Sequence, residues 1–111
     1  MSQSHQYPAL SESTYYILLS LSIPMHGYGI MQNVKMLTNE RLNLAPGTLY
    51  GAISSLLDKD LISPLPPDED KRKKEYILTS TGQKALQSEI KRLEELYYNG
   101  LKMVKGDRHN D

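Results

Sequence analysis

The sequence predicts a mostly α-helical protein with a small β-hairpin and a long C-terminal helix. First, apolar residues recur at three- and four-residue steps in segments separated by Pro, Gly and polar residues, which is the pattern of amphipathic helices. Second, two short runs at residues 61–65 and 75–79 flank a charged, turn-rich loop. Third, the last periodic segment runs for about 25 residues, which is longer than an ordinary surface helix.

Composition limits the classes of function. The 111 residues fit one domain, and 13 basic against 13 acidic side chains give a formal net charge of zero. The absence of Cys excludes disulfides, thiol catalysis and cysteine-based zinc sites. No run approaches the ~18 apolar residues of a membrane span, and the N-terminus lacks the basic and apolar blocks of a signal peptide. We expect a cytoplasmic protein without membrane association, in which the distribution of charge decides any binding to nucleic acid.

Three helices are expected in the first half of the sequence. The first covers residues 11–22, with Ser11 as a candidate N-cap. The second covers residues 27–37, where apolar residues return at helical spacing after Pro24. The third runs from Pro46 to about Asp60 and begins with Pro at the first helical position, where the missing N–H costs nothing.

The hairpin and a fourth helix follow. Ser80 and Gln83 fit a capping box, although Thr79 is an alternative cap, and helical periodicity then continues to about residue 105. Three helices, two strands around a charged loop and a further helix form the order of a winged helix-turn-helix domain. The expected parts are a flexible arm at 1–10, a winged helix-turn-helix domain at 11–79, a dimerisation helix at 80–105 and a tail at 106–111.

Four short blocks resemble the PadR family of transcriptional regulators, in the family's order. Thr14–Leu19 is similar to its first helix, His26–Ile30 to the start of its second, Pro46–Tyr50 to its third, and Tyr76–Gly82 to its second strand and the turn into the last helix. The resemblance implies the short branch of the family, which has one helix after the wing. It also implies a homodimeric repressor of a few promoters that is often relieved by a small molecule.

Three positions depart from the family's pattern. Ala45 stands where a residue able to cap the third helix is common, so a phosphate oxygen is an alternative partner for the first N–H groups. Glu75 stands where an aromatic residue is common, which weakens packing at the base of the wing. Asp68, Glu69 and Asp70 precede the basic run of the wing, so the loop is not a simple cationic finger.

Candidate DNA contacts lie on the third helix and in the wing. The start of a recognition helix needs short polar side chains that reach base edges, and Thr48 offers a hydroxyl and a methyl group, while the Tyr50 hydroxyl reaches a phosphate or a base. Basic wing residues suit salt-sensitive phosphate binding. In the alternative interpretation, Thr48 and Tyr50 only complete a helix start and the wing is a solvated hairpin tip. The candidates are Gly47, Thr48, Tyr50, Ser54, Lys71, Arg72, Lys73 and Lys74.

The last helix is the candidate dimer interface, because its apolar stripe exceeds what a small domain can cover within one chain. The alternative is that the stripe packs entirely inside one chain. A two-fold dimer predicts a palindromic DNA site with half-sites about one turn apart. The candidate interface residues are Tyr15, Leu86, Ile90, Leu93, Leu96, Tyr97, Leu101 and Val104.

A ligand site and other functions are weaker predictions. Tyr15, Tyr16, Tyr97 and Tyr98 are candidates for a pocket that binds a planar effector, with ordinary packing as the alternative. No metal, cofactor or catalytic constellation is expected, because the three His lack ligand spacing and no nucleophile motif is present. The sequence therefore predicts a non-enzymatic regulator that binds double-stranded DNA as a homodimer. A protein-interaction or small-molecule sensor module with the same fold, without direct DNA binding, stays the alternative.

Overall fold

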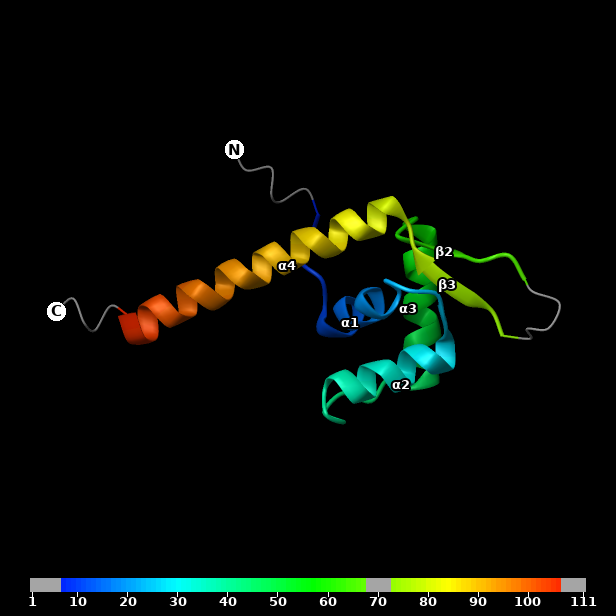
Figure 1. The fold of residues 1–111 in the computed structure, drawn as a ribbon, viewed down its shortest axis with the longest axis horizontal. Helices are drawn as coiled ribbons and strands as arrows, with labels where there is room; N and C mark the ends of the chain where they lie inside the picture. The colour runs from blue at the N-terminus through cyan, green and yellow to red at the C-terminus, as the bar shows by residue number, and fades with distance from the viewer. Residues whose placement is uncertain (1–6, 68–72, 107–111) are drawn as a thin grey trace.

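The computed structural model describes residues 7–67 and 73–106, and it confirms the predicted fold class (Figure 1). Three helices form a compact head with a small sheet, and a long helix projects from the head. The elements are α1 (Glu12–Ser20), β1 (Met25–His26), α2 (Gly27–Leu37), α3 (Pro46–Asp58), β2 (Ile62–Pro64), β3 (Glu75–Leu78) and α4 (Ser80–Leu101), followed by a π-helical turn at Lys102–Gly106.

The core lies where α1, α2 and α3 meet the sheet. Each helix contributes apolar side chains at three- or four-residue steps, as amphipathic helices do. Ser11 caps α1, since its side chain accepts a hydrogen bond from the backbone N–H of Thr14 at 3.1 Å. A side-chain bond from Asn33 to Ser20 at 2.9 Å joins α2 to α1. The fully buried side chains with the largest volumes are Ile17, Leu18, Leu21, Ile30, Val34, Leu49 and Ile62.

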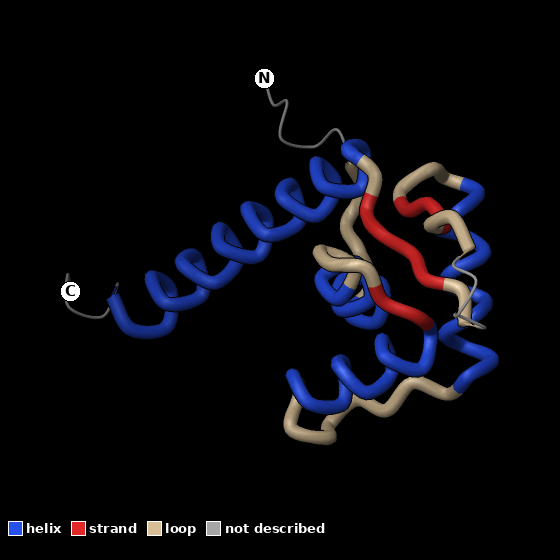
Figure 2. The backbone as a smooth tube through the Cα atoms, turned by 45° about the vertical axis from the view of Figure 1, so that its right-hand side comes forward, coloured by secondary structure: helices blue, strands red, loops and turns tan. Residues whose placement is uncertain are grey.

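The sheet has three antiparallel strands in the order β1-β3-β2, so the prediction of a simple hairpin is incomplete (Figure 2). In β1, Met25 pairs with Tyr76 and His26 pairs with Glu75. A strand of two residues has too little alternation to be recognised, and only its pairing with a distant segment defines it. Through this pairing, β1 fixes the start of α2 beside the base of the wing.

The junction between α3, β2 and α4 is tightly packed. Thr79, the alternative cap, is confirmed as the N-cap of α4, because its hydroxyl oxygen accepts from the N–H of Gly82 at 2.9 Å. The same hydroxyl donates to the carbonyl of Asp60 at 2.7 Å. Asp60 has φ 64° and ends α3 in a Schellman turn, so α3 stops at Asp58, slightly before the predicted end. A Cβ at Gly82 would overlap the carbonyl oxygen of Leu61.

The first turns of α4 belong to the head, and the rest of the helix extends away from it (Figure 1). Glu89 is buried on α4, where Arg92 donates to both carboxylate oxygens and the backbone N–H of Leu10 donates at 3.3 Å. Leu10 itself packs against the core. Packing of the N-terminal segment therefore begins at Leu10, within the predicted arm, while residues 1–6 lie outside the described part.

Candidate nucleic-acid interface

The two faces of α3 differ in chemistry. Leu49, Ile53 and Leu56 point into the core and are almost fully buried. The opposite face is exposed and carries small or hydroxyl-bearing residues, which leaves a helix surface that fits into a groove without steric conflict. All four candidates predicted on this helix lie on the exposed face, together with Gly51: Gly47, Thr48, Tyr50 and Ser54.

The start of α3 offers uncapped N–H groups. Ala45 is the N-cap residue and makes no side-chain cap hydrogen bond, as its identity predicts, and Pro46 follows at the first helical position. The first turn contains no acidic residue. No Cβ placed at Gly47 would meet an atom within 4 Å, so the backbone there is open to a close approach. Uncapped N–H groups and the positive end of the helix dipole are suited to an anion.

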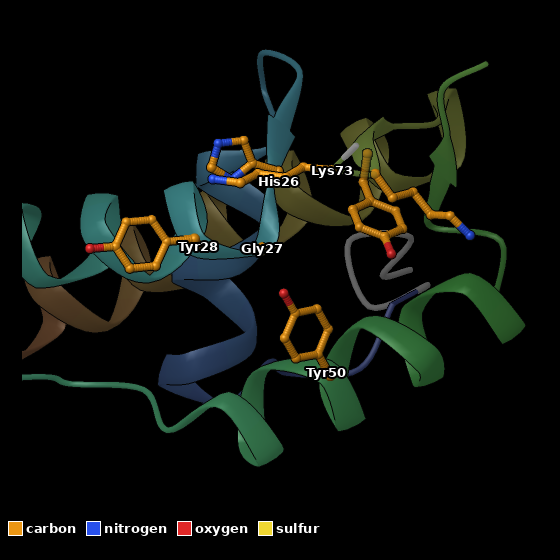
Figure 3. Close-up of a pocket in the computed structure, with 7 residues that line it drawn as sticks. His26, Gly27, Tyr28, Tyr50 and Lys73 are labelled. Atoms are coloured by element: carbon orange, nitrogen blue, oxygen red, sulfur yellow. The ribbon is translucent and has the colours of Figure 1, made fainter. Parts of the chain in front are cut away.

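Tyr50 leans from α3 toward the start of α2 (Figure 3). A Cβ at Gly27 would overlap the Tyr50 hydroxyl and would lie 2.7 Å from Cζ of its ring. The ring therefore packs against the bare backbone of Gly27, although the side chain as a whole is 48% exposed. This contact places the Tyr50 hydroxyl beside α2, so it does not project outward from the exposed face of α3.

The base of the wing carries basic side chains next to this tyrosine. Lys73 and Lys74 are exposed, and Lys73 Nζ lies 5.7 Å from the centroid of the Tyr28 ring, within cation–π range. The N–H of Leu65 donates to the carbonyl of Glu75 at 2.9 Å, which continues the β2–β3 pairing into the wing. The other two predicted wing residues, Lys71 and Arg72, lie outside the described residues.

A cleft of about 180 Å³ opens between α2, α3 and the wing (Figure 3). His26 lines it and is also the N-cap of α2, since Nδ1 accepts from the N–H of Gly29 at 3.0 Å. Burial, and then the neighbouring Tyr50, raise the pKa of Tyr76, so its phenol keeps its hydrogen at neutral pH. The lining residues are His26, Gly27, Tyr28, Tyr50, Lys73, Lys74 and Tyr76.

The sequence predicts a helix start at His26–Ile30 and places Tyr50 in a separate helix, but it does not predict the cleft between them. The two meet because β1 pairs with β3 and because Gly27 has no side chain to keep the Tyr50 ring away. A glycine opposite an aromatic residue of a neighbouring helix is a signal that only a contact map reveals.

The dimer candidates divide into three groups by exposure. Leu86 is 6% exposed and belongs to the core of its own chain, so it has little surface left for a partner. Tyr15, Leu93 and Leu101 are half-buried. The exposed members all lie on α4 and the turn that follows it: Ile90, Leu96, Tyr97 and Val104.

The effector candidates form two separate ring pairs. Tyr15 and Tyr16 meet edge to face with centroids 5.5 Å apart and pack against the core. Tyr97 and Tyr98 are tilted with centroids 5.3 Å apart, and both are exposed. Burial, followed by Tyr16 and Glu89, raises the pKa of Tyr15. Each pair lies on a single helix, so a pocket made by all four would need the pairs brought together.

Residues 13–88 match the model of the transcriptional regulator PadR-like family. The chain belongs to this family. Membership of this family of transcriptional regulators supports a DNA-binding regulator and points to a non-enzymatic transcription factor. Within the described residues, no helix has the length and apolarity to cross a membrane, and no cluster of His, Cys, Asp and Glu is arranged to hold a metal ion.

Two solved structures and one curated protein illustrate the similarity. The structure of smu.1704 from Streptococcus mutans UA159 has a TM-score of 0.71 at 26% identity, covering 91% of this chain and 95% of that one. A transcriptional regulator from Clostridium thermocellum has a TM-score of 0.69 at 26% identity, covering 85% and 93%. An uncharacterized 37.1 kDa protein in transposon TN4556 of Streptomyces fradiae is 38% identical over 66 residues. That match spans 60% of this chain but only 18% of the Streptomyces protein.

Proposed function

We propose that this PadR-like chain acts as a homodimeric repressor that binds a palindromic operator, with α3 in the major groove and the wing on the flanking backbone. The observation that supports the proposal most directly is the exposed face of α3. Its first turns present Gly47, Thr48 and Ser54 to solvent, while the opposite apolar face anchors the helix in the core. A rigid helix with a small, polar outer face is what direct readout of base edges requires.

The charge pattern supports phosphate contacts on both sides of this face. The uncapped start of α3 favours an anion, and Lys73 and Lys74 extend from the wing. A single subunit offers few such contacts, so tight binding calls for two copies. Counterion release then gives a salt slope of several units, at about 0.9 per phosphate neutralised.

The exposed apolar residues of α4 support dimerisation through this helix. Leu96 and Tyr97 are 51% and 62% exposed on a helix that projects beyond the head. Such a stripe is stabilised by burial against an identical stripe related by a two-fold axis. The two recognition helices then address half-sites about 34–36 Å apart.

Relief of repression by a small aromatic ligand is the remaining part of the proposal. Tyr97 and Tyr98 offer exposed aromatic rings on α4, and Tyr15 and Tyr16 offer half-buried rings on α1. A dimer in which Tyr97 of one subunit lies close to α1 of the other would have an aromatic-lined site at its interface.

Fluorescence anisotropy on duplexes from the DNA upstream of the chain's own gene tests the function. We expect salt-sensitive binding, with Thr48→Ala weakening the operator complex more than the complex with random duplex. Lys73→Gln combined with Lys74→Gln should weaken both complexes and flatten the salt dependence. Lys35→Gln combined with Lys84→Gln, two exposed positions on α2 and α4, removes the same charge and is the matched control. An absence of salt-sensitive binding at micromolar protein would favour the protein-interaction alternative.

A further inference from the structure

Tyr50 differs from the other exposed residues of α3 in where its polar atom lies. Thr48 and Ser54 are exposed on α3, whereas the Tyr50 hydroxyl lies against Gly27 at the start of α2. The ring stands between α3 and α2, as Figure 3 shows. A hydroxyl fixed there is poorly placed for a base edge in the groove that α3 would enter.

The cleft around this hydroxyl collects hydrogen-bond donors and positive charge. Lys73 and Lys74, which carry positive charge on the wing, are among its lining residues, and Lys73 Nζ lies beside Tyr28. His26 uses Nδ1 as an acceptor for the N–H of Gly29, so the neutral ring carries its hydrogen on Nε2 and has a donor there. None of the seven lining residues is a carboxylate. The donor set therefore matches a phosphate.

The walls of the cleft match the sugar that accompanies a backbone phosphate. Tyr28, Tyr50 and Tyr76 contribute aromatic surface from α2, α3 and β3. Lys73 Nζ lies 5.7 Å from the centroid of the Tyr28 ring, a cation–π contact that joins the base of the wing to α2 at one edge of the cleft. At about 180 Å³ the cleft has more room than a bare phosphate needs.

We propose that this cleft seats one deoxyribose-phosphate unit of the DNA backbone, with the Tyr50 hydroxyl and Lys73 as phosphate donors and His26 as a further donor. The inference rests on the proposed DNA-binding function and deepens it, because it assigns Tyr50 to the backbone and leaves base reading to Thr48 and Ser54. The cleft is lined by residues of α2, α3 and the wing, so a phosphate bound in it would fix the angle at which α3 enters the groove.

Tyr50→Phe removes the hydroxyl and keeps the ring on Gly27, and Tyr7→Phe is the matched control outside the cleft. We expect Tyr50→Phe to weaken binding to the operator and to random duplex by similar factors, about tenfold for a bond to a charged group. Tyr7→Phe should leave both unchanged. Weakening confined to the operator would overturn the inference, because it would mean that Tyr50 reads a base.

A methylphosphonate scan of the footprinted operator locates the phosphate. At one position per half-site, replacing the charged phosphate should weaken Tyr50→Phe by a smaller factor than it weakens the wild-type chain, because the bond from Tyr50 is already absent while Lys73 and His26 still contact that phosphate. If every methylphosphonate position weakens Tyr50→Phe and the wild-type chain by the same factor, the inference is overturned. If the wild-type chain binds and footprints DNA but no position shows this difference between the two chains, only the phosphate site in the cleft is refuted. If the wild-type chain binds no duplex, the proposed function is refuted as well.

Titration with inorganic phosphate separates a free anion from the backbone. NMR signals of Tyr50 and His26 should move only weakly with millimolar inorganic phosphate and strongly with the operator duplex. Strong shifts with inorganic phosphate, together with no coupled methylphosphonate position, would assign the cleft to a small anion and would overturn the DNA-backbone inference.

Discussion

The segment of α4 from Ser80 to Glu89 lies against the head, whereas the segment from Ile90 to Leu101 projects beyond it. Both carry apolar residues at the same helical spacing. In the first segment, Leu86 is buried in the core and Gly82 lies directly under a backbone carbonyl. In the second, Leu96 is exposed. One amphipathic helix thus stabilises the subunit at one end and leaves exposed apolar side chains at the other, where we propose the dimer interface.

The largest expected effect comes from breaking the first segment. Gly82→Ala places a methyl group on the carbonyl oxygen of Leu61, a backbone atom held by the N–H of Thr79, so the junction of α4 with β2 must open. We expect a loss of about 3 kcal/mol in the free energy of unfolding, at the upper end of overpacking effects. Urea denaturation followed by circular dichroism measures it. A loss below about 0.5 kcal/mol would mean that the junction is more tolerant than this contact implies.

Breaking the second segment should leave the subunit folded and separate the dimer. Leu96→Glu puts a charge on the exposed stripe, and burying it unpaired in an interface should weaken dimerisation about 100-fold. Gln87→Glu makes the same charge change on an exposed position of the first segment and is the control. Sedimentation velocity distinguishes the species. A Leu96→Glu chain that sediments like a wild-type dimer would place the interface elsewhere.

Glu89 lies at the boundary between the two segments and links the N-terminal segment to α4. The bonds from Arg92, together with the N–H of Leu10, hold the pKa of Glu89 below its usual range, against the opposing effect of burial. A lowered folded-state pKa means that the stabilisation is complete above the unfolded-state pKa of about 4.3 and is lost as pH falls through the folded-state value.

Glu89→Gln tests this link. We expect a loss of about 2 kcal/mol near neutral pH, typical of bonds to a charged group, and a flatter decline in stability below about pH 4. Glu94→Gln, at an exposed position on the same helix, is the matched control. Thermal unfolding over a pH series measures both variants. Parallel pH curves for wild type and Glu89→Gln would contradict a stabilising role for the ionised carboxylate.

Periodicity predicted the helices well because each one presents an apolar face to a shared core. Residue type predicted Ser11 as the cap of α1, and the departure from the family's pattern indicated the uncapped Ala45 at the start of α3. Periodicity failed where distant segments decide the outcome. The pairing of β1 with β3 was not predicted, and neither was the assignment of Leu86 to the subunit core. Both depend on which surfaces meet, and a repeat of 3.6 residues carries no information about its partner.

The candidate DNA interface shows the same division. The residue types on α3 indicated a readable helix face, because size and polarity decide what enters a groove. The direction of the Tyr50 hydroxyl was not predictable, since it depends on the absence of a side chain at Gly27, on another helix. The size and polarity of the exposed α3 face could therefore be predicted from the sequence, whereas the contact between Tyr50 on α3 and Gly27 on α2 could not.

The smallest expected effect comes from Gly100→Ala, the counterpart of Gly82→Ala in the second segment. No atom lies within 4 Å of a Cβ at Gly100, so the methyl group meets no obstacle within the subunit. Alanine in a helix interior is favoured over glycine by about 0.5–1 kcal/mol, and we expect a gain of that size in urea denaturation. If Gly100→Ala instead weakens the dimer in sedimentation, the partner helix approaches the backbone at Gly100, and the second segment is as closely packed in the dimer as the first is in the subunit.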